Sequence, residues 1–426
     1  MGLFPMNGFF QKHFLHILWL LSSSCLVLPP AFAAEAPCEN FQSPESVLAC
    51  AVKNHPEIRQ AEVALQQGEA LENVAGQRPN LELNSQAVTA NTSAGRLDYV
   101  EFNLAHTFEL GGKRGARIEQ AQAARTLTEA DLLKAKEQVY LTTLSTLYRL
   151  RQGQTELKIV MDALSTFGKI QQVFRSRSRL SPDQSVSLQI IELAEGDYRA
   201  RRAVLESELL TLNKTLELAT GHDLSQNPKV LPARKTNWPV RTHDELKAPL
   251  AGSAYRAAQA DLRLSEAKLS LEQSLSWPDL KLGPTYEYQS QGLSSHHAFG
   301  LNFTLPLPLF HSNGAGRASA RYGMNRSEIG IEAARIEVSA QKEILLGKYE
   351  GAVQFLKNAP TEAEIARRRK STQGYFDRGL VSGALVIEAH RQILDFSKSQ
   401  NEQELTAIES LVKLDSLSGR LFQENL

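Results

Sequence analysis

The sequence predicts a mainly α-helical protein with a small membrane β part, arranged as two structural repeats of helix, strand, strand and long helix hairpin. Three observations predict this fold. Two long stretches without proline, 80–181 and 361–426, allow long helices because proline interrupts them. Four short segments alternate apolar and polar residues, which is typical of strands. Finally, "RPNLEL" at 78–83 returns as "WPDLKL" at 277–282, an offset of 199 residues (277 minus 78).

The N-terminus has the pattern of a secretory signal. Lys12 and His13 precede the apolar run "FLHILWLL", and Ala31 and Ala33 fit a small-residue cleavage site. We therefore expect residues 1–33 to be a signal peptide. Its apolar run is too short for a stable anchor, and no later run reaches about 18 apolar residues. Lys plus Arg and Asp plus Glu both number 47, so no global field favours nucleic acid.

The cysteines agree with export. Cys25 lies in the predicted signal, which leaves Cys38 and Cys50 in the exported chain. We predict a disulfide between these two, since disulfides persist in oxidising compartments. Two unrelated buried thiols or a lipid-modified N-terminal cysteine are the alternatives.

Each half is expected to contain one hairpin of strands and one hairpin of helices. The first half, 34–220, has expected strands near 81–89 and 99–108 and expected helices at 113–178 and 183–219. The second half, 249–426, has expected strands near 280–289 and 298–305 and expected helices at 314–377 and 383–419. The segment 221–248 carries several prolines and is predicted to be an equatorial segment between the repeats, forming a belt with the C-terminal tail. An ordinary helical bundle would show the same helical composition.

The strands separate apolar from polar side chains. The apolar positions are Leu81, Leu83 and Ala87; Val100, Phe102, Leu104 and Phe108; Leu280, Leu282, Tyr286 and Tyr288; and Phe299, Leu301, Phe303 and Leu305. Polar residues alternate with them, which suits transmembrane barrel strands of about nine residues. A soluble sandwich would alternate in the same way. Four strands cannot close a barrel without exposed edges in lipid, so copies of the chain must pool their strands, and three copies would supply twelve.

Together these features resemble the TolC-like outer-membrane efflux factors. "FELGGKRGAR" at 108–117 looks like the strand-to-helix junction of the cobalt–zinc–cadmium resistance outer-membrane subunits, and "LPLPLF" at 305–310 followed by "NGAGR" looks like the second junction. The resemblance implies a homotrimer with a twelve-stranded barrel in outer-membrane lipid and an α-helical barrel in the periplasm. It also implies a periplasmic adaptor (membrane fusion protein) and an inner-membrane transporter, for which we expect a proton-driven metal antiporter.

The junctions are expected to redirect the chain from tilted strand to near-axial helix. Gly111 and Gly112 permit unusual backbone angles, and Lys113 and Arg114 would meet lipid phosphates or carboxylates at the membrane interface. In the second junction, the expected residues are Pro306, Pro308, Gly314 and Gly316. "GGKRG" is not a phosphate-binding loop because it lacks the Walker spacing.

The turns of the two helix hairpins are expected at the far end of the helices. The resemblance places adaptor docking and gating there, at Arg179, Leu180, Ser181, Gly379, Leu380, Val381 and Ser382. Asp183 is the proposed gate residue, with partners Arg175, Arg177, Arg179 and Arg378 in neighbouring turns. Simple turn chemistry is the alternative, since Ser-Pro-Asp suits a helix start.

No catalytic motif is present, and we expect neither an enzyme nor a cofactor. His296 and His297 are adjacent in an expected outer loop, where solvated side chains are more probable than metal ligands. The predicted function is the outer-membrane channel of a tripartite efflux pump, exporting divalent heavy-metal cations. The alternatives are export of drugs or secreted protein, and a periplasmic coiled-coil scaffold without membrane insertion.

Overall fold

The computed structural model describes residue 38 and residues 41–93, 95–310 and 312–422. The predicted signal peptide, including Cys25, lies outside these residues. The elements of the compact unit that begins at Asn40 are α2 (Pro44–Asn54), α3 (Pro56–Ala75), β1 (Glu82–Thr92), β2 (Gly95–Phe108), α4 (Lys113–Arg175), α5 (Pro182–Thr220), η1 (Pro228–Val230), η2 (His243–Lys247), α6 (Ser253–Ser274), β3 (Leu280–Gln291), β4 (Ser294–Thr304), α7 (Gly314–Asn358), α8 (Glu362–Asp377) and α9 (Gly383–Leu417).

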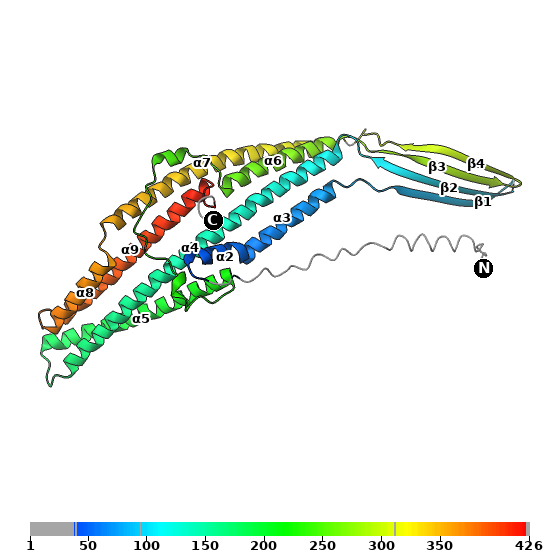
Figure 1. Ribbon diagram of the computed structural model, residues 1–426. Coiled ribbons are helices and arrows are strands. Elements are labelled where there is room, and N and C mark those ends of the chain that lie inside the picture. The colour runs from blue at the N-terminus through cyan, green and yellow to red at the C-terminus, as the bar shows by residue number, and fades with distance from the viewer. Residues whose placement is uncertain (1–37, 39–40, 94, 311, 423–426) are drawn as a thin grey trace, which may run out of the picture. The chain divides into compact units, whose positions relative to one another are not determined.

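Long helices dominate this unit, as the proline gaps predict (Figure 1). Helix α4 alone has 63 residues, which corresponds to about 95 Å at 1.5 Å per residue. It packs against α3, α5, α6 and α9, while α7 packs against α6 and α9. Within the described residues, no helix is both long and apolar enough to cross a membrane.

The expected single helix 314–377 is wrong, because the structure breaks it into α7 and α8. Ala359 is extended (φ −78°, ψ 143°), as expected before a proline. Thr361 then starts α8 with a capping box, in which its side chain accepts a hydrogen bond from the Glu364 backbone and the Glu364 carboxylate caps Thr361. Gln400 of α9 donates a hydrogen bond to the Pro360 carbonyl at 2.8 Å. The break is therefore encoded by Pro360 and its neighbours.

The four strands form one antiparallel sheet in the order β1-β2-β3-β4. The residues between the expected strands, 90–98 and 290–297, are mostly strand as well, so each hairpin is longer and its turn is shorter than predicted. In the second hairpin, Gly292 turns the chain with a φ of 61° and Leu293 completes the connection. Polar side chains at the strand ends hid this extension, because strands outside a buried core need not be apolar.

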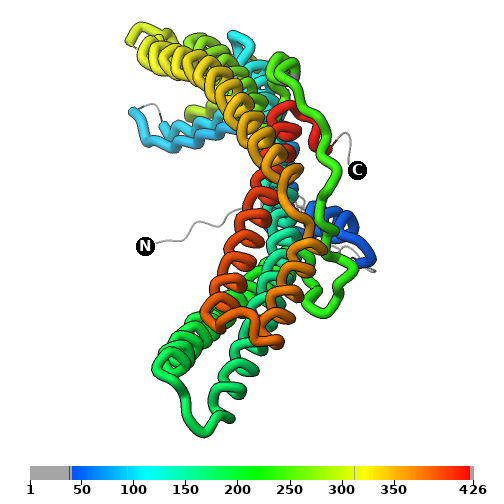
Figure 2. Tube along the Cα trace, turned by 90° about the vertical axis from the view of Figure 1, so that its left-hand side faces the viewer, coloured from blue at the N-terminus to red at the C-terminus, as the bar shows by residue number. Residues whose placement is uncertain are grey.

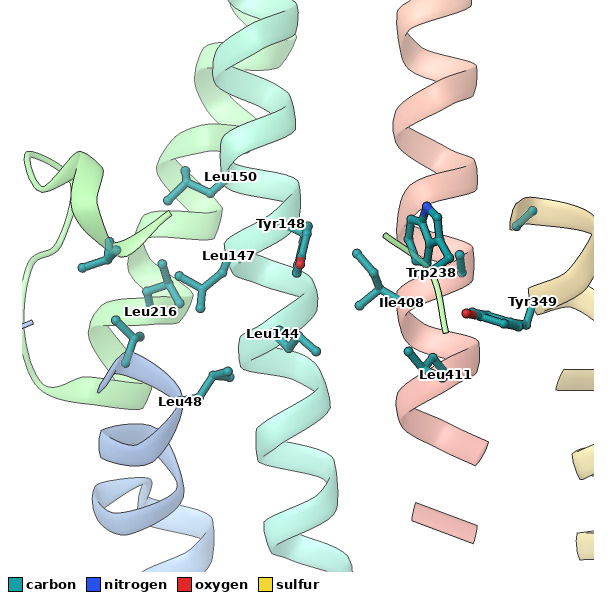
Figure 3. Packing of buried hydrophobic residues seen from close by; sticks show 14 of the residues in the cluster. Leu48, Leu144, Leu147, Tyr148, Leu150, Leu216, Trp238, Tyr349, Ile408 and Leu411 are labelled. Atoms are coloured by element: carbon teal, nitrogen blue, oxygen red, sulfur yellow. The ribbon is translucent and has the colours of Figure 1, made fainter. Parts of the chain in front are cut away.

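The largest core cluster lies where the inter-repeat segment crosses the long helices. Trp238 packs edge-on to Tyr349 of α7 at 6.3 Å between ring centroids and lies beside Ile408 and Leu411 of α9 (Figure 3). The Tyr349 hydroxyl also donates a hydrogen bond to the Pro239 carbonyl at 2.6 Å. The segment 221–248 therefore packs on α7 and α9, while the belt around a tunnel stays a prediction.

A second core cluster holds the ends of the helix hairpins together. It joins Phe167 of α4, Tyr198 of α5 and Val386 of α9, all almost fully buried. In both views, the α4–α5 and α8–α9 turns lie at the same end of this unit (Figures 1 and 2). Both predicted tips are thus neighbours within one chain.

His390 of α9 is buried in this second cluster, with its ring 5.8 Å from that of Phe167. Burial, and to a smaller extent the nearby Arg369 cation, lower the pKa of His390 from 6.5 to about 4, against the smaller opposing effect of Asp162. Asp162 itself pairs with Arg369 at 2.7 Å. The imidazole is therefore neutral at physiological pH.

A buried polar network links α4, α5 and α9 farther along the helices. Arg149 bonds to Glu156 and to Glu208 (2.8 and 2.6 Å), and Asn401 donates a hydrogen bond to Glu156 at 2.8 Å. Burial alone would lower the pKa of Arg149, but its hydrogen bonds to Glu208 and Glu156 outweigh this effect and raise the pKa. Glu156 is fully buried, so the loss of one of these partners would be strongly destabilising.

Candidate functional site: the sheet, its junctions and the helix tips

The sheet carries one continuous apolar face. Residues directly opposite in antiparallel strands share a face, and Phe102 is opposite Tyr286, which is opposite Phe299. Leu83 is likewise opposite Leu104. The predicted alternation is confirmed by this register in all four strands. Phe299 is 84% exposed, so no described part of the chain covers the middle of this face.

The opposite face is polar and carries an excess of carboxylates. Glu82 pairs with Lys281 at 2.7 Å, so these two charges cancel. Glu101 and Glu287 lie directly opposite each other on β2 and β3, and the Tyr99 hydroxyl donates a hydrogen bond to Glu101 at 2.8 Å. Like charges in opposite positions destabilise a sheet, so this pair has a cost within the isolated chain.

Both edges of the sheet are unpaired in the described chain. β1 pairs only with β2, and β4 pairs only with β3. Each edge therefore presents a row of backbone N–H and C=O groups that another strand can satisfy.

The first junction uses its two glycines as expected. Gly111 and Gly112 have φ values of 72° and 74°, in the left-handed region. A Cβ at Gly111 would lie 2.6 Å from the Trp277 ring. Lys113 is buried and pairs with Asp279 of the second half at 2.6 Å, so it meets a carboxylate of its own chain.

The next arginines of α4 also contact groups of their own chain. Arg114 donates a hydrogen bond to the Gly76 carbonyl at 2.7 Å. Arg117 pairs with Glu109 and donates to the Gln77 carbonyl at 3.2 Å. The sequence alone did not reveal that the cations of this junction contact Asp279, Gly76 and Glu109. The contacts to Asp279 and Gly76 join segments that are distant in the sequence.

The second junction differs from its prediction. Asn313, not glycine, takes the left-handed conformation there, with a φ of 52°. Its side chain donates to the backbone carbonyl and the carboxylate of Glu272 (2.8 and 2.7 Å). Gly314 begins α7 with an ordinary backbone, whereas Gly316 avoids a clash, since a Cβ would lie 2.3 Å from the Asn313 and Glu272 side chains. Pro306 and Pro308 lie between β4 and this turn, as expected.

The first tip is an exposed turn with a well-formed helix start. Ser181 caps α5 in a capping box with Gln184, and each backbone N–H bonds the other's side chain at 3.2 Å. Arg179 and Asp183 are exposed and Leu180 is half-buried. The simple turn chemistry is therefore present, and docking at these residues remains a prediction.

The second tip ends α8 with a left-handed glycine. Gly379 has a φ of 72°, and its N–H bonds the Phe376 carbonyl at 2.7 Å. Leu380 is 65% exposed, Val381 is half-buried, and Ser382 caps α9 by accepting a hydrogen bond from Leu385 N. This leaves a large apolar side chain, Leu380, facing solvent in the isolated chain.

Three of the four arginines expected around Asp183 have other contacts within the described chain. Arg175 pairs with Glu192 at 2.8 Å, Arg177 lies over the Phe174 ring, and Arg378 lies over the Tyr375 ring. The contacts proposed for Asp183 would form between copies, so its gating role stays a prediction.

A family model matches the second half of this architecture. Residues 254–420, from α6 through α9, match the model described as outer membrane efflux protein. This match bears out the resemblance to outer-membrane efflux proteins that the sequence suggests, and the outer-membrane localisation.

Two proteins that are similar to this chain are named for metal resistance. The chain is 24% identical over 252 residues to the cobalt-zinc-cadmium resistance protein CzcC of Cupriavidus metallidurans, covering 57% of each protein. It is 22% identical to the nickel-cobalt-cadmium resistance protein NccC of Alcaligenes xylosoxydans xylosoxydans, covering 73% of this chain and 70% of that protein. The alignment to CzcC thus spans less than two thirds of that relative.

The fold of a solved outer-membrane channel matches nearly the whole of this chain. The crystal structure of the Campylobacter jejuni CmeC outer membrane channel matches it with a TM-score of 0.68 at 15% identity, covering 93% of this chain and 94% of that one. This likeness confirms the mainly helical channel fold with a small sheet.

The remaining candidate residues have defined surroundings. Cys38 and Cys50 are both in the disulfide form, and their pairing with each other stays a prediction. His296 and His297 lie in strand β4 rather than a loop, and His297 Nδ1 is 2.7 Å from the Tyr286 hydroxyl. Among the described residues, no group of three histidine, cysteine or acidic side chains is placed to hold a metal.

Proposed function

We propose that this chain is the outer-membrane channel of a tripartite efflux pump and a passive exit duct for divalent heavy-metal cations. The observation that carries the proposal is the four-stranded sheet, which has an exposed apolar face, a polar face and two unpaired edges. Such a sheet suits lipid only when its edges are closed.

Three copies joined edge to edge would form a closed barrel of twelve strands. Two copies would give eight strands, a number that side chains fill. The larger ring leaves a lumen, into which the polar face with Glu101 and Glu287 would point. Long helices such as α4 would continue the duct from the junctions into the periplasm.

The cargo is inferred from charge and from the relatives. Once the pair of Glu82 and Lys281 cancels, Glu101 and Glu287 are the net charges along the polar face of the strands. Threefold repetition would give a ring of carboxylates that favours cations over anions. The names of CzcC and NccC point in the same direction, toward cobalt, cadmium, zinc or nickel.

The partners would meet the channel at the other end of the helices. We assign adaptor docking to the exposed tip residues Arg179 and Leu380 and the half-buried Leu180, and gating to Asp183. A periplasmic adaptor and a proton-driven inner-membrane metal antiporter would complete the pump, so the chain itself needs no catalytic site.

The proposal is tested by membrane fractionation followed by conductance in planar bilayers. We expect a heat-labile trimer from outer membranes with a preference for cations, and a Glu101→Gln/Glu287→Gln variant with a weaker preference. Glu82→Gln/Lys281→Met is the matched control, because it removes two charges without changing the net charge. A folded, detergent-free monomer, or equal selectivity in all three channels, would contradict the proposal.

A further inference from the structure

A cavity of about 490 Å³ lies beside the second strand-to-helix junction. The end of α6 contributes Gln273, and Ser276 and Trp277 follow it. The start of α7 contributes Arg317 and Arg321. The tips and the polar face of the sheet do not contribute to it, so it is separate from the proposed duct and docking site.

The cavity is strongly basic. Arg317 and Arg321 are one helical turn apart and both are exposed. Neither forms an ion pair with a carboxylate of the described residues. The first turn of α7 also contains no acid, although a helix N-terminus carries partial positive charge and disfavours cations. Two arginines and the N-terminus of α7 therefore lie at one unfilled space, and the neighbouring carboxylate of Glu272 is already hydrogen-bonded to Asn313.

The first half of the chain provides an internal comparison. Arg117 lies in the matching turn of α4, and its guanidinium pairs with Glu109, eight residues earlier. Eight residues before Arg317, the chain has Leu309 instead of a carboxylate. The position 200 residues before Arg321 is Ala121. At these two positions, the second half therefore has an apolar residue in place of the carboxylate and a cation in place of alanine.

Exposed apolar residues lie on the segment that precedes α7 and at Trp277, which lines the basic cavity. Phe310 is fully exposed, and Leu309 and Trp277 are 75% and 59% exposed. This segment continues from the end of β4, whose Phe303 belongs to the apolar face of the sheet. An apolar surface that meets a pair of arginines and an exposed tryptophan matches the boundary between lipid tails and headgroups. The apolar surface favours a lipid over a small soluble anion, because such an anion has no apolar part to bury there.

We propose that Arg317 and Arg321, with Trp277 beside them, bind the headgroup phosphate of a phospholipid in the periplasmic leaflet. Guanidinium groups bind phosphate through charge-assisted, often bidentate, hydrogen bonds. The acyl chains would lie along Leu309 and Phe310. This inference rests on the proposed insertion of the sheet into the outer membrane.

The test measures retention of phosphatidylglycerol by the purified trimer with native mass spectrometry. We expect the Arg317→Gln/Arg321→Gln variant to bind the lipid at least about tenfold more weakly, as expected for two lost hydrogen bonds to a charged group. Arg326→Gln, on the same helix and also exposed, is the matched control and should retain the lipid. The Arg317→Lys/Arg321→Lys variant should bind with intermediate affinity.

Tryptophan fluorescence gives an independent readout. Trp238 is buried and Trp19 lies in the predicted signal, so a Trp238→Phe variant of the mature chain reports on Trp277 alone. Phosphatidylglycerol with brominated acyl chains should quench this emission, and the double glutamine variant should reduce the quenching.

Three results would overturn the inference. Lipid retention could be equal in the double glutamine variant and the wild type. Inorganic phosphate could displace the lipid at millimolar concentration, which would indicate a soluble anion. The glutamine variant could lose subunits with unchanged lipid affinity, which would indicate an acidic partner in a neighbouring copy. Membrane fractionation and a size measurement of the wild-type protein are done first. If they show no outer-membrane trimer, the proposed function fails, whereas the lipid measurements test only the lipid site.

Discussion

Replacing His390 by leucine should remove a pH-dependent weakness at the hairpin ends. His390 is neutral in the folded protein because it is buried among α4, α5, α8 and α9. The groups that face it are the Arg369 and Asp162 pair and the ring of Phe167, which packs in turn on Tyr198. None of these offers an unpaired carboxylate to stabilise an imidazolium.

The pKa of His390 gives the size of the effect. It falls from 6.5 to about 4 on folding, so between these values the unfolded segment binds more protons than the folded one. Stability is therefore complete above pH 6.5 and is lost as the pH falls toward 4. The loss is about 1.4 kcal/mol at pH 5.5, or tenfold in the opening equilibrium, and reaches about 3 kcal/mol near pH 4.

Hydrogen exchange of the detergent-solubilised trimer measures this opening. Protection factors of amides near His390, corrected for intrinsic exchange rates, should fall about tenfold between pH 7.5 and 5.5 in the wild type. The His390→Leu variant should lose much less, and His243→Gln, an exposed control, should behave as the wild type. Parallel losses in the wild type and His390→Leu would refute the reasoning.

Three further predictions concern the junction, the disulfide and the tip. Gly111→Ala should destabilise the junction by several kcal/mol, because the new Cβ would lie 2.6 Å from Trp277 in a left-handed backbone; the thermal midpoint of the trimer measures this. Cys38 and Cys50 should be bridged in the exported protein, as a mass measurement under non-reducing conditions will show. Asp183→Asn keeps the helix cap and removes the charge, so resting conductance and cation preference in planar bilayers should change.

The junction prediction has a matched control, and each of the three has a contrary outcome. Gly115→Ala is the control for the junction, because a Cβ there meets nothing within 4 Å, and equal thermal midpoints would contradict the steric argument. Two free thiols or an acylated cysteine would contradict the bridge. Unchanged conductance after Asp183→Asn would leave that residue only as an acidic residue in the first turn of α5, where it favours the helix dipole.

The sequence was informative wherever one local rule decided the structure. Period-2 alternation placed Phe102 and Phe299 on the same face, because a strand has only two faces. The start of α4 was predicted at its observed residue, Lys113, since Gly111 and Gly112 mark the turn.

Other features depend on contacts that a linear reading does not contain. Asn313 takes a backbone conformation usual for glycine because Glu272, distant in the sequence, holds its side chain. Lys113 is buried because Asp279 of the other half neutralises it. The break at Pro360 was readable in principle, but the helix formers on both sides outweighed a single proline in the pattern.

The unpaired edges of β1 and β4 have a consequence for genetics. In the proposed ring, every copy must pair through both of its edge strands, so one chain whose edge strand cannot pair prevents closure of the whole ring. Equal expression of wild-type and edge-defective chains would leave only about one in eight rings free of defective chains, by random assembly of three. A proline placed in the middle of β4 should therefore act as a dominant allele, whereas a loss of expression should be recessive.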